Sequence, residues 1–115
     1  SICDALLGAA NLGDIGKHFP DTDPKYKGID SKILLKEAMV FIRAKGYELV
    51  NIDSTICLQT PKIGSYIPEM QKVLANSMGV DIDLVSIKAT TTETLGFVGR
   101  EEGVSAYATV LINKI

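Results

Sequence analysis

Apolar residues recur every three to four positions in three segments of the chain, over residues 1–12, 30–45 and 65–78. That spacing places them along one side of an α-helix, so the pattern predicts three amphipathic helices. Asp30 or Ser31 can cap the second helix, because a short polar side chain there accepts a hydrogen bond from the amides of the first turn. The residues expected to face the core from the second and third helices are Ile33, Leu34, Ala38, Phe41, Ile42, Ile67, Met70, Val73 and Leu74.

Alternation of apolar and polar residues predicts strands between and after these helices. Over residues 47–59 the side chains expected on the buried face are Val50, Ile52, Ile56 and Leu58, and those expected on the other face are Asn51, Asp53, Thr55 and Gln59. Residues 85–90 and 103–113 predict a short strand and a closing strand. This order of elements indicates an α/β fold, an α+β sandwich whose helices pack on one face of a mixed β-sheet, in a single domain over residues 1–115.

Composition narrows the classes of function. The net charge is −2, with 12 basic and 14 acidic residues and no basic run, so we expect no nucleic-acid partner, because such proteins carry a clustered positive face. No apolar stretch is long enough to span a membrane. Cys3 and Cys57 lie far apart in apolar segments, which is typical of reduced core thiols in a cytoplasmic protein.

The loop that begins at Gly13 carries the first group of candidate functional residues. Gly16 lets backbone amides approach a ligand closely, and the Asp14 carboxylate can accept from sugar hydroxyls. Asp21 and Asp23 follow in a proline-bounded stretch, where carboxylates more often bond their own backbone in an Asx turn. His18 is the sole histidine of the chain, and without a ligand partner at metal spacing we expect it to pack in the loop or at the surface.

The second group follows the predicted strand at residues 85–90. The hydroxyls of Thr90, Thr91 and Thr92 can donate to phosphate oxygens, and Glu93 can hold a hard cation such as Mg²⁺. The alternative is an ordinary strand end with a solvated glutamate.

Two basic side chains suit the same anionic ligand. Lys62 can meet a phosphate as a point charge, and Arg100 can bind one in bidentate fashion or form an exposed ion pair. These residue types suit a reaction that positions a phosphate ester and neutralises its charge.

Together these segments resemble the 2-C-methyl-D-erythritol 2,4-cyclodiphosphate synthases of the non-mevalonate isoprenoid pathway. The resemblance covers essentially the whole chain and rests on Asp4-Ala5-Leu6-Leu7-Gly8-Ala9, Gly13-Asp14-Ile15-Gly16, Phe19-Pro20-Asp21-Thr22-Asp23-Pro24, Pro61-Lys62, Lys88-Ala89-Thr90-Thr91-Thr92-Glu93 and Leu95-Gly96-Phe97-Val98-Gly99-Arg100. It implies that 4-diphosphocytidyl-2-C-methyl-D-erythritol 2-phosphate is cyclised to 2-C-methyl-D-erythritol 2,4-cyclodiphosphate with release of CMP. It also implies a homotrimer, with sheets around a central channel and active sites between subunits, located in the cytoplasm or, for a plant-type source, in the plastid.

The resemblance assigns roles by position. Thr91 would stabilise the transition state, and Glu93 would hold Mg²⁺ or Mn²⁺ through the diphosphate. The methylerythritol portion would lie against residues 14–16, and the cytidine and its phosphates against residues 60–63 and 90–91. The full set of implied substrate-binding residues is Asp14, Ile15, Gly16, Phe19, Pro20, Asp21, Thr22, Asp23, Thr60, Pro61, Lys62, Ile63, Thr90, Thr92, Glu93, Phe97 and Arg100.

The chain departs from the family at the transition-metal site. Zinc, or another divalent transition metal, is bound in the family by an Asp-x-His pair and a further histidine that would immediately precede Ser1, so we expect no zinc ligands in this chain and an N-terminally incomplete domain. Two alternatives remain open at this point. One is a non-catalytic trimeric module that binds a cytidine nucleotide or an isoprenoid diphosphate, and the other is a generic α/β domain whose loops are structural.

Overall fold

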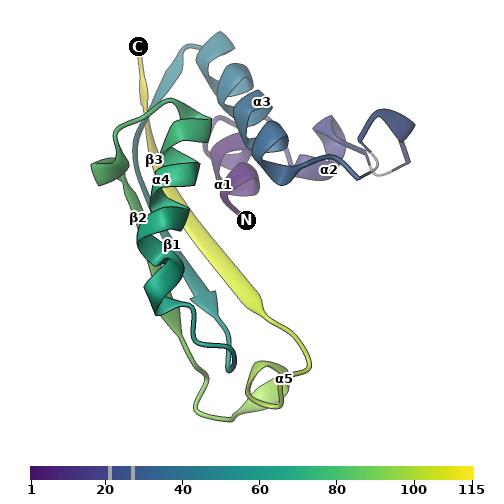
Figure 1. Cartoon of the computed structure of the whole chain (residues 1–115). Coiled ribbons are helices and arrows are strands. Elements are labelled where there is room, and N and C mark those ends of the chain that lie inside the picture. Colours follow the sequence, from purple (N-terminus) through teal and green to yellow (C-terminus); the bar gives the residue numbers. More distant parts are fainter. Residues whose placement is uncertain (21, 27) are drawn as a thin grey trace.

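The computed structural model describes residues 1–20, 22–26 and 28–115, and it arranges them as helices packed over a three-stranded sheet (Figure 1). The helices are α1 (Ile2–Ala9), α2 (Ile15–His18), α3 (Ser31–Ala44), α4 (Ile67–Met78) and α5 (Gly96–Gly99), with 3-10 turns at Pro24–Tyr26, Gly64–Tyr66 and Ile82–Leu84. The strands are β1 (Tyr47–Cys57), β2 (Val85–Thr90) and β3 (Ser105–Lys114). None of these helices combines the length and apolarity that crossing a bilayer requires.

The sheet is mixed, as the sequence predicts. Its strand order is β2-β1-β3, with β1 parallel to β2 and antiparallel to β3. Helices α1, α3 and α4 cover one face (Figure 1). Because β1 and β2 run in the same direction, both strands end at the same edge of the sheet, next to α5 (Figure 1).

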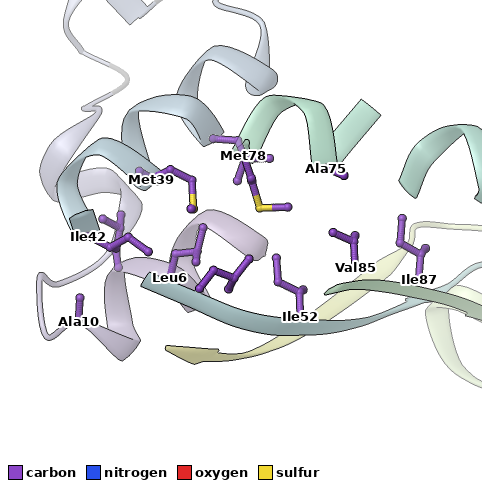
Figure 2. Packing of buried hydrophobic residues seen from close by; sticks show 13 residues of the cluster. Leu6, Ala10, Met39, Ile42, Ile52, Ala75, Met78, Val85 and Ile87 are labelled. Atoms are coloured by element: carbon purple, nitrogen blue, oxygen red, sulfur yellow. The ribbon is translucent and has the colours of Figure 1, made fainter. Parts of the chain in front are cut away.

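The core lies between this sheet face and the three helices (Figure 2). Its largest fully buried side chains come from every layer: Leu6, Leu7, Met39, Ile42, Ile52, Met78 and Val85. Burying apolar surface of this kind contributes roughly 25 cal/mol per Å², so these contacts hold the three helices against the sheet.

The face of β1 differs from the prediction near its start. Val50, expected in the core, is 38% exposed, and Leu49 is buried in its place. The pairing of β1 with β3 shifts register between Leu49 and Asn51, and such a bulge reverses the direction in which side chains point on one side of it. Beyond the bulge Ile52 is buried and Asn51 is exposed, as predicted.

The buried stripe of α3 also differs from the prediction. Leu35, Ala38, Met39 and Ile42 are buried, whereas Ile33 is exposed. The four buried residues follow the i, i+3, i+4, i+7 spacing of a single helix face. The packing of α3 against the other elements therefore buries this face of the helix and leaves exposed the neighbouring face that contains Ile33.

Helix ends follow local chemistry. Asp30 caps α3, with its side chain accepting from the amide of Lys32, as predicted. The first helix ends at Ala9, earlier than expected, and Asn11 takes the left-handed turn with φ 56°. The third predicted helix begins two residues later than expected, at Ile67 after a 3-10 turn. Gly79 closes it in the left-handed conformation.

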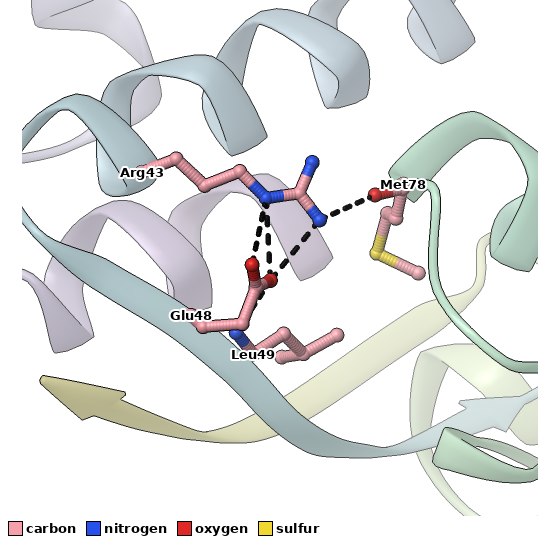
Figure 3. A network of polar contacts seen from close by, with 4 residues as sticks. All are labelled: Arg43, Glu48, Leu49 and Met78. Carbon is pink, nitrogen blue, oxygen red and sulfur yellow. Dashed lines mark hydrogen bonds and ion pairs between the residues drawn. The ribbon is translucent and has the colours of Figure 1, made fainter. Parts of the chain in front are cut away.

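One polar network ties three elements together at the end of the sheet far from α5 (Figure 3). The Arg43 guanidinium at the end of α3 donates to the Glu48 carboxylate on β1 at 3.0–3.2 Å and to the carbonyl of Met78 on α4 at 3.0 Å. The hydrogen bond from Arg43 lowers the pKa of Glu48 below its ordinary value. The network therefore links α3, β1 and α4 by a charge-assisted contact.

Candidate functional site

A cavity of about 320 Å³ opens at the edge where β1 and β2 end. Residues that follow the two strands line it, together with the turn that leads into α4: Leu58, Gln59, Pro61, Lys62, Ile63, Gly64, Ala89, Thr90 and Thr91. The parallel pairing of β1 and β2 thus brings residues 61–63 and 90–91, some 30 positions apart in the sequence, into one hollow. Such an edge of a parallel strand pair is a common position for ligand sites.

Thr60 is the exception in its segment. It does not line this cavity but a neighbouring one of about 290 Å³, which reaches Val98 of α5 and the carboxylate residues Glu101 and Glu102. Residues 60–63, which the resemblance assigns to one site, therefore line two adjacent cavities in the structure.

The three threonines after β2 differ in how their hydroxyls are used. Thr90 Oγ1 donates to the carbonyl of Thr91 at 3.2 Å, and Thr92 Oγ1 donates to the carbonyl of Leu95 at 2.7 Å. Thr91 Oγ1 instead accepts from the amide of Glu93 at 3.3 Å. Among the described residues, Thr91 is therefore the threonine of this group whose hydroxyl hydrogen is not committed to the protein, and it remains able to donate to a ligand oxygen.

Helix α5 presents the remaining predicted residues of this loop. Phe97 is half exposed, and Val98 beside it is buried and anchors the helix. The Arg100 guanidinium pairs with Glu102 at 2.8 Å in an exposed ion pair, which is the ordinary alternative considered for this arginine. Glu93 is exposed at the tip of the turn.

The other predicted group lies around α2, which is far from α5 and from the ends of β1 and β2 (Figure 1), where the cavity opens. Asp14 caps α2, with Oδ1 accepting from the amide of Lys17 at 2.9 Å. The amide of Ile15 donates to the Asp4 carboxylate at 2.7 Å, which fixes α2 to α1. Gly16 is exposed, so its backbone is open to a ligand. The described part of one chain therefore does not bring this group and the cavity together.

The segment after α2 is held by aromatic packing. His18 donates from Nε2 to the carbonyl of Leu12 at 2.6 Å, and its ring centroid lies 5.0 Å from that of Phe41. This is the packing role expected for His18. Phe19 is buried, and its ring centroid lies 5.9 Å from that of Phe41.

The carboxylate-rich part of this loop is only partly described. Asp23 Oδ1 accepts from the amide of Lys25 at 3.0 Å, the local turn considered as its alternative role. Pro20 is half buried and Thr22 is exposed. Asp21 lies outside the described residues.

Within residues 1–20, 22–26 and 28–115, no three His, Cys, Asp or Glu side chains gather closely enough to hold a metal ion. These residues therefore do not fit the zinc site that the resemblance implies. The Glu93 carboxylate is exposed, and a carboxylate oxygen is the type of ligand that Mg²⁺ accepts.

The sequence reasoning assigned no role in the site to three residues, although Asp4 and Gly99 belong to segments that carry the resemblance. Asp4 and Gln59 bond the backbone of distant loops, and Gly99 packs against the backbone of Thr94. A polar residue at the end of a strand and a glycine inside a short helix are weak signals, since neither has a periodic pattern. Only their tertiary contacts distinguish them from surface residues.

Comparisons with known proteins agree with this architecture. The model of the YgbB family matches residues 1–113. The 2-C-methyl-D-erythritol 2,4-cyclodiphosphate synthase of Bacteroides fragilis (strain YCH46) is 66% identical over 115 residues, which are all of this chain and 72% of that protein. The bifunctional IspDF from Campylobacter jejuni superimposes with a TM-score of 0.96 at 44% identity, covering all of this chain and 31% of that one. The Plasmodium falciparum IspF CDP complex superimposes with a TM-score of 0.86 at 31% identity, covering 99% and 68%. This chain belongs to the YgbB family.

Proposed function

We propose that this chain converts 4-diphosphocytidyl-2-C-methyl-D-erythritol 2-phosphate to 2-C-methyl-D-erythritol 2,4-cyclodiphosphate and CMP. The observation that carries the proposal is the match of the entire chain, at 66% identity, to a synthase named for that product. A relative of the same fold forms a CDP complex, which supports a cytidine nucleotide as the ligand of the cavity at the end of β1 and β2.

The reaction forms one phosphorus–oxygen bond and breaks another. An oxygen of the 2-phosphate attacks the β-phosphorus, and the bond from that phosphorus to the bridging oxygen breaks, so that CMP leaves with the bridging oxygen and its electron pair. Phosphoryl transfer of this kind is promoted chiefly by positioning and by neutralising charge. We assign positioning of the nucleotide to the cavity walls at residues 61–63 and 90–91, and neutralisation of its phosphates to Lys62.

Thr91 is assigned the transition-state contact. Its hydroxyl hydrogen is not committed to the described part of the protein, and the amide of Glu93 fixes the position of its oxygen. A donor fixed in this way stabilises charge as it develops on the reacting phosphate, at no cost of reorganisation. The Glu93 carboxylate would hold Mg²⁺ or Mn²⁺ on the diphosphate, where the ion supplies further charge neutralisation. No step is assigned to zinc, because the described residues do not form a site for it.

A complete site requires more than one chain under this proposal. The α2 region, assigned to the methylerythritol portion through Asp14 and Gly16, lies far from the ends of β1 and β2 in its own chain (Figure 1), where the cavity opens. We propose a homotrimer in which the α2 region of one subunit meets the cavity of its neighbour. The uncovered sheet face supports this, because Tyr107 is 64% and Leu111 58% exposed on it, and such apolar surface is typical of an interface. Sedimentation equilibrium should give the mass of three chains, and a monomer at micromolar concentration would refute this assembly.

The decisive experiment measures product formation by ³¹P NMR in purified protein supplied with divalent cations. Thr91→Ala should lower the single-turnover rate of CMP release by about 10²–10³-fold, while Thr91→Ser, which keeps the hydroxyl, should retain most of it. Binding of CDP without any CMP release by the wild type would favour the alternative of a non-catalytic nucleotide-binding module. Failure to bind CDP would leave a purely structural role for the loops.

A further inference from the structure

The turn after β2 adopts a backbone conformation that its own residues disfavour. Glu93 and Thr94 both have positive φ, at 54° and 63°. The left-handed region brings Cβ too close to the carbonyl oxygen, and for a β-branched residue such as Thr94 it is a genuine outlier. Such a conformation persists only where surrounding contacts over-determine it.

One of those contacts comes from a different part of the chain. The side-chain carbonyl of Gln59, just beyond the end of β1, accepts a hydrogen bond from the amide of Thr94 at 3.3 Å, across 35 positions of sequence. The other side-chain bonds of the turn are local, from the Glu93 amide to Thr91 Oγ1, from Thr92 Oγ1 to the Leu95 carbonyl and from Thr94 Oγ1 to the Glu93 carbonyl. Among the described residues, Gln59 is therefore the side chain that ties this turn to the neighbouring strand.

The same turn carries the two groups on which the proposed function depends. Glu93 and Thr94 are the two residues in the left-handed conformation, and Thr91 lies two positions before Glu93. The side-chain positions of Thr91 and Glu93 therefore depend on the backbone conformation of the turn, which includes Thr94. Gln59 also lines the cavity beside Pro61 and Lys62. It thus joins the wall at the end of β1 to the turn at the end of β2.

We propose that Gln59 is a positioning residue for the cyclisation reaction, because its side-chain carbonyl holds Thr94 in the left-handed conformation that orients Thr91 and Glu93 toward the diphosphate. This inference rests on the proposed function. It assigns Gln59 no contact with reacting atoms. Its effect is to reduce the number of conformations that the turn samples before the transition state, so its loss should lower kcat more than it raises KM.

The test compares Gln59→Met, which keeps the length of the side chain but removes the acceptor, with wild type in the full protein. One lost hydrogen bond of this kind corresponds to a factor of about 3–10, so kcat for CMP release should fall by about that factor. The affinity for CDP, measured by calorimetry, should change less. Hydrogen exchange of the Thr94 amide should accelerate by a similar factor, and this readout does not depend on activity.

Two further variants separate positioning from a general structural role. Thr94→Asn in the Gln59→Met background should restore part of kcat, because asparagine tolerates the left-handed region. Gln71→Met is the matched control. Gln71 donates to the carbonyl of Val85 at 2.7 Å, at the opposite end of β2, so its loss should lower thermal stability and leave kcat unchanged.

The outcomes are distinct. An active wild type whose kcat and Thr94 amide protection are both unaffected by Gln59→Met would overturn the role of Gln59 alone. Equal losses of kcat in Gln59→Met and Gln71→Met, without rescue by Thr94→Asn, would overturn it in favour of general destabilisation. A wild type that released no CMP would overturn the proposed function and with it this role.

Discussion

Gly99 is the position at which a single added methyl group should do most damage to the candidate site. It ends α5, and its backbone packs directly on the backbone of Thr94. A Cβ at this position would lie 2.1 Å from the Thr94 carbonyl carbon and 2.6 Å from its Cα and oxygen. Real Cβ atoms essentially never approach another heavy atom within 3.0 Å, so Gly99→Ala must push the two segments apart by about 1 Å.

The consequence of that displacement can be estimated from the turn itself. Thr94 belongs to the turn that carries Thr91 and Glu93, and a shift of about 1 Å in a catalytic group can cost about 10²-fold in rate. Overpacking also destabilises by about 1–3 kcal/mol. Because the clash is with backbone, rotation of a side chain cannot relieve it. We therefore expect Gly99→Ala to lower kcat for CMP release by about 10²-fold.

Gly8→Ala is the matched control. Gly8 is exposed on α1, and an added Cβ there meets no atom of the described residues within 4 Å. Alanine in a helix is favoured over glycine by about 0.5–1 kcal/mol, so this variant should be slightly more stable and fully active. The measurements are ³¹P NMR of product formation and thermal unfolding of both variants. Wild-type activity in Gly99→Ala would refute the packing described for α5 and the turn.

Two further predictions concern stability. Leu6 is fully buried, so Leu6→Ala should lower the free energy of unfolding by about 2–5 kcal/mol. The Val40 side chain on α3 is 62% exposed, so Val40→Ala should change that free energy by less than about 0.5 kcal/mol. Urea titration measures both values, and similar losses in the two variants would contradict the described core. Arg43 lowers the pKa of Glu48 in the folded chain, so around pH 4 the folded state binds fewer protons than the unfolded one. The contribution of this pair is therefore complete above the ordinary glutamate pKa of about 4.3 and is lost as pH falls through the lowered folded value. Glu48→Gln should flatten the loss of stability on the acid side in urea titrations at several pH values, and an unchanged slope would show that the pair in Figure 3 contributes nothing.

Features that depend on neighbours in the sequence were predictable from the sequence. The Asp30 cap, the strand at residues 85–90 and the closure of α4 by Gly79 all follow from the preferences of a few adjacent residues. The residue types after β2 likewise indicated chemistry suited to phosphates, because hydroxyls and a carboxylate suit such ligands wherever the backbone places them.

Other features were decided by tertiary structure. The bulge that turns Val50 outward depends on the pairing of β1 with β3, and the choice of core face on α3 depends on the elements packed against it. No local preference encodes either, because each is a compromise between segments that meet only in the folded state. The same holds for the hydrogen bond from Thr94 to Gln59. The sequence determined the three longer helices, the three strands and the chemistry of the loops, whereas the short helices α2 and α5 lie in segments expected to be loops. Only the fold decided which side chains share a cavity, because residues distant in the chain become neighbours when the apolar faces of the elements pack together.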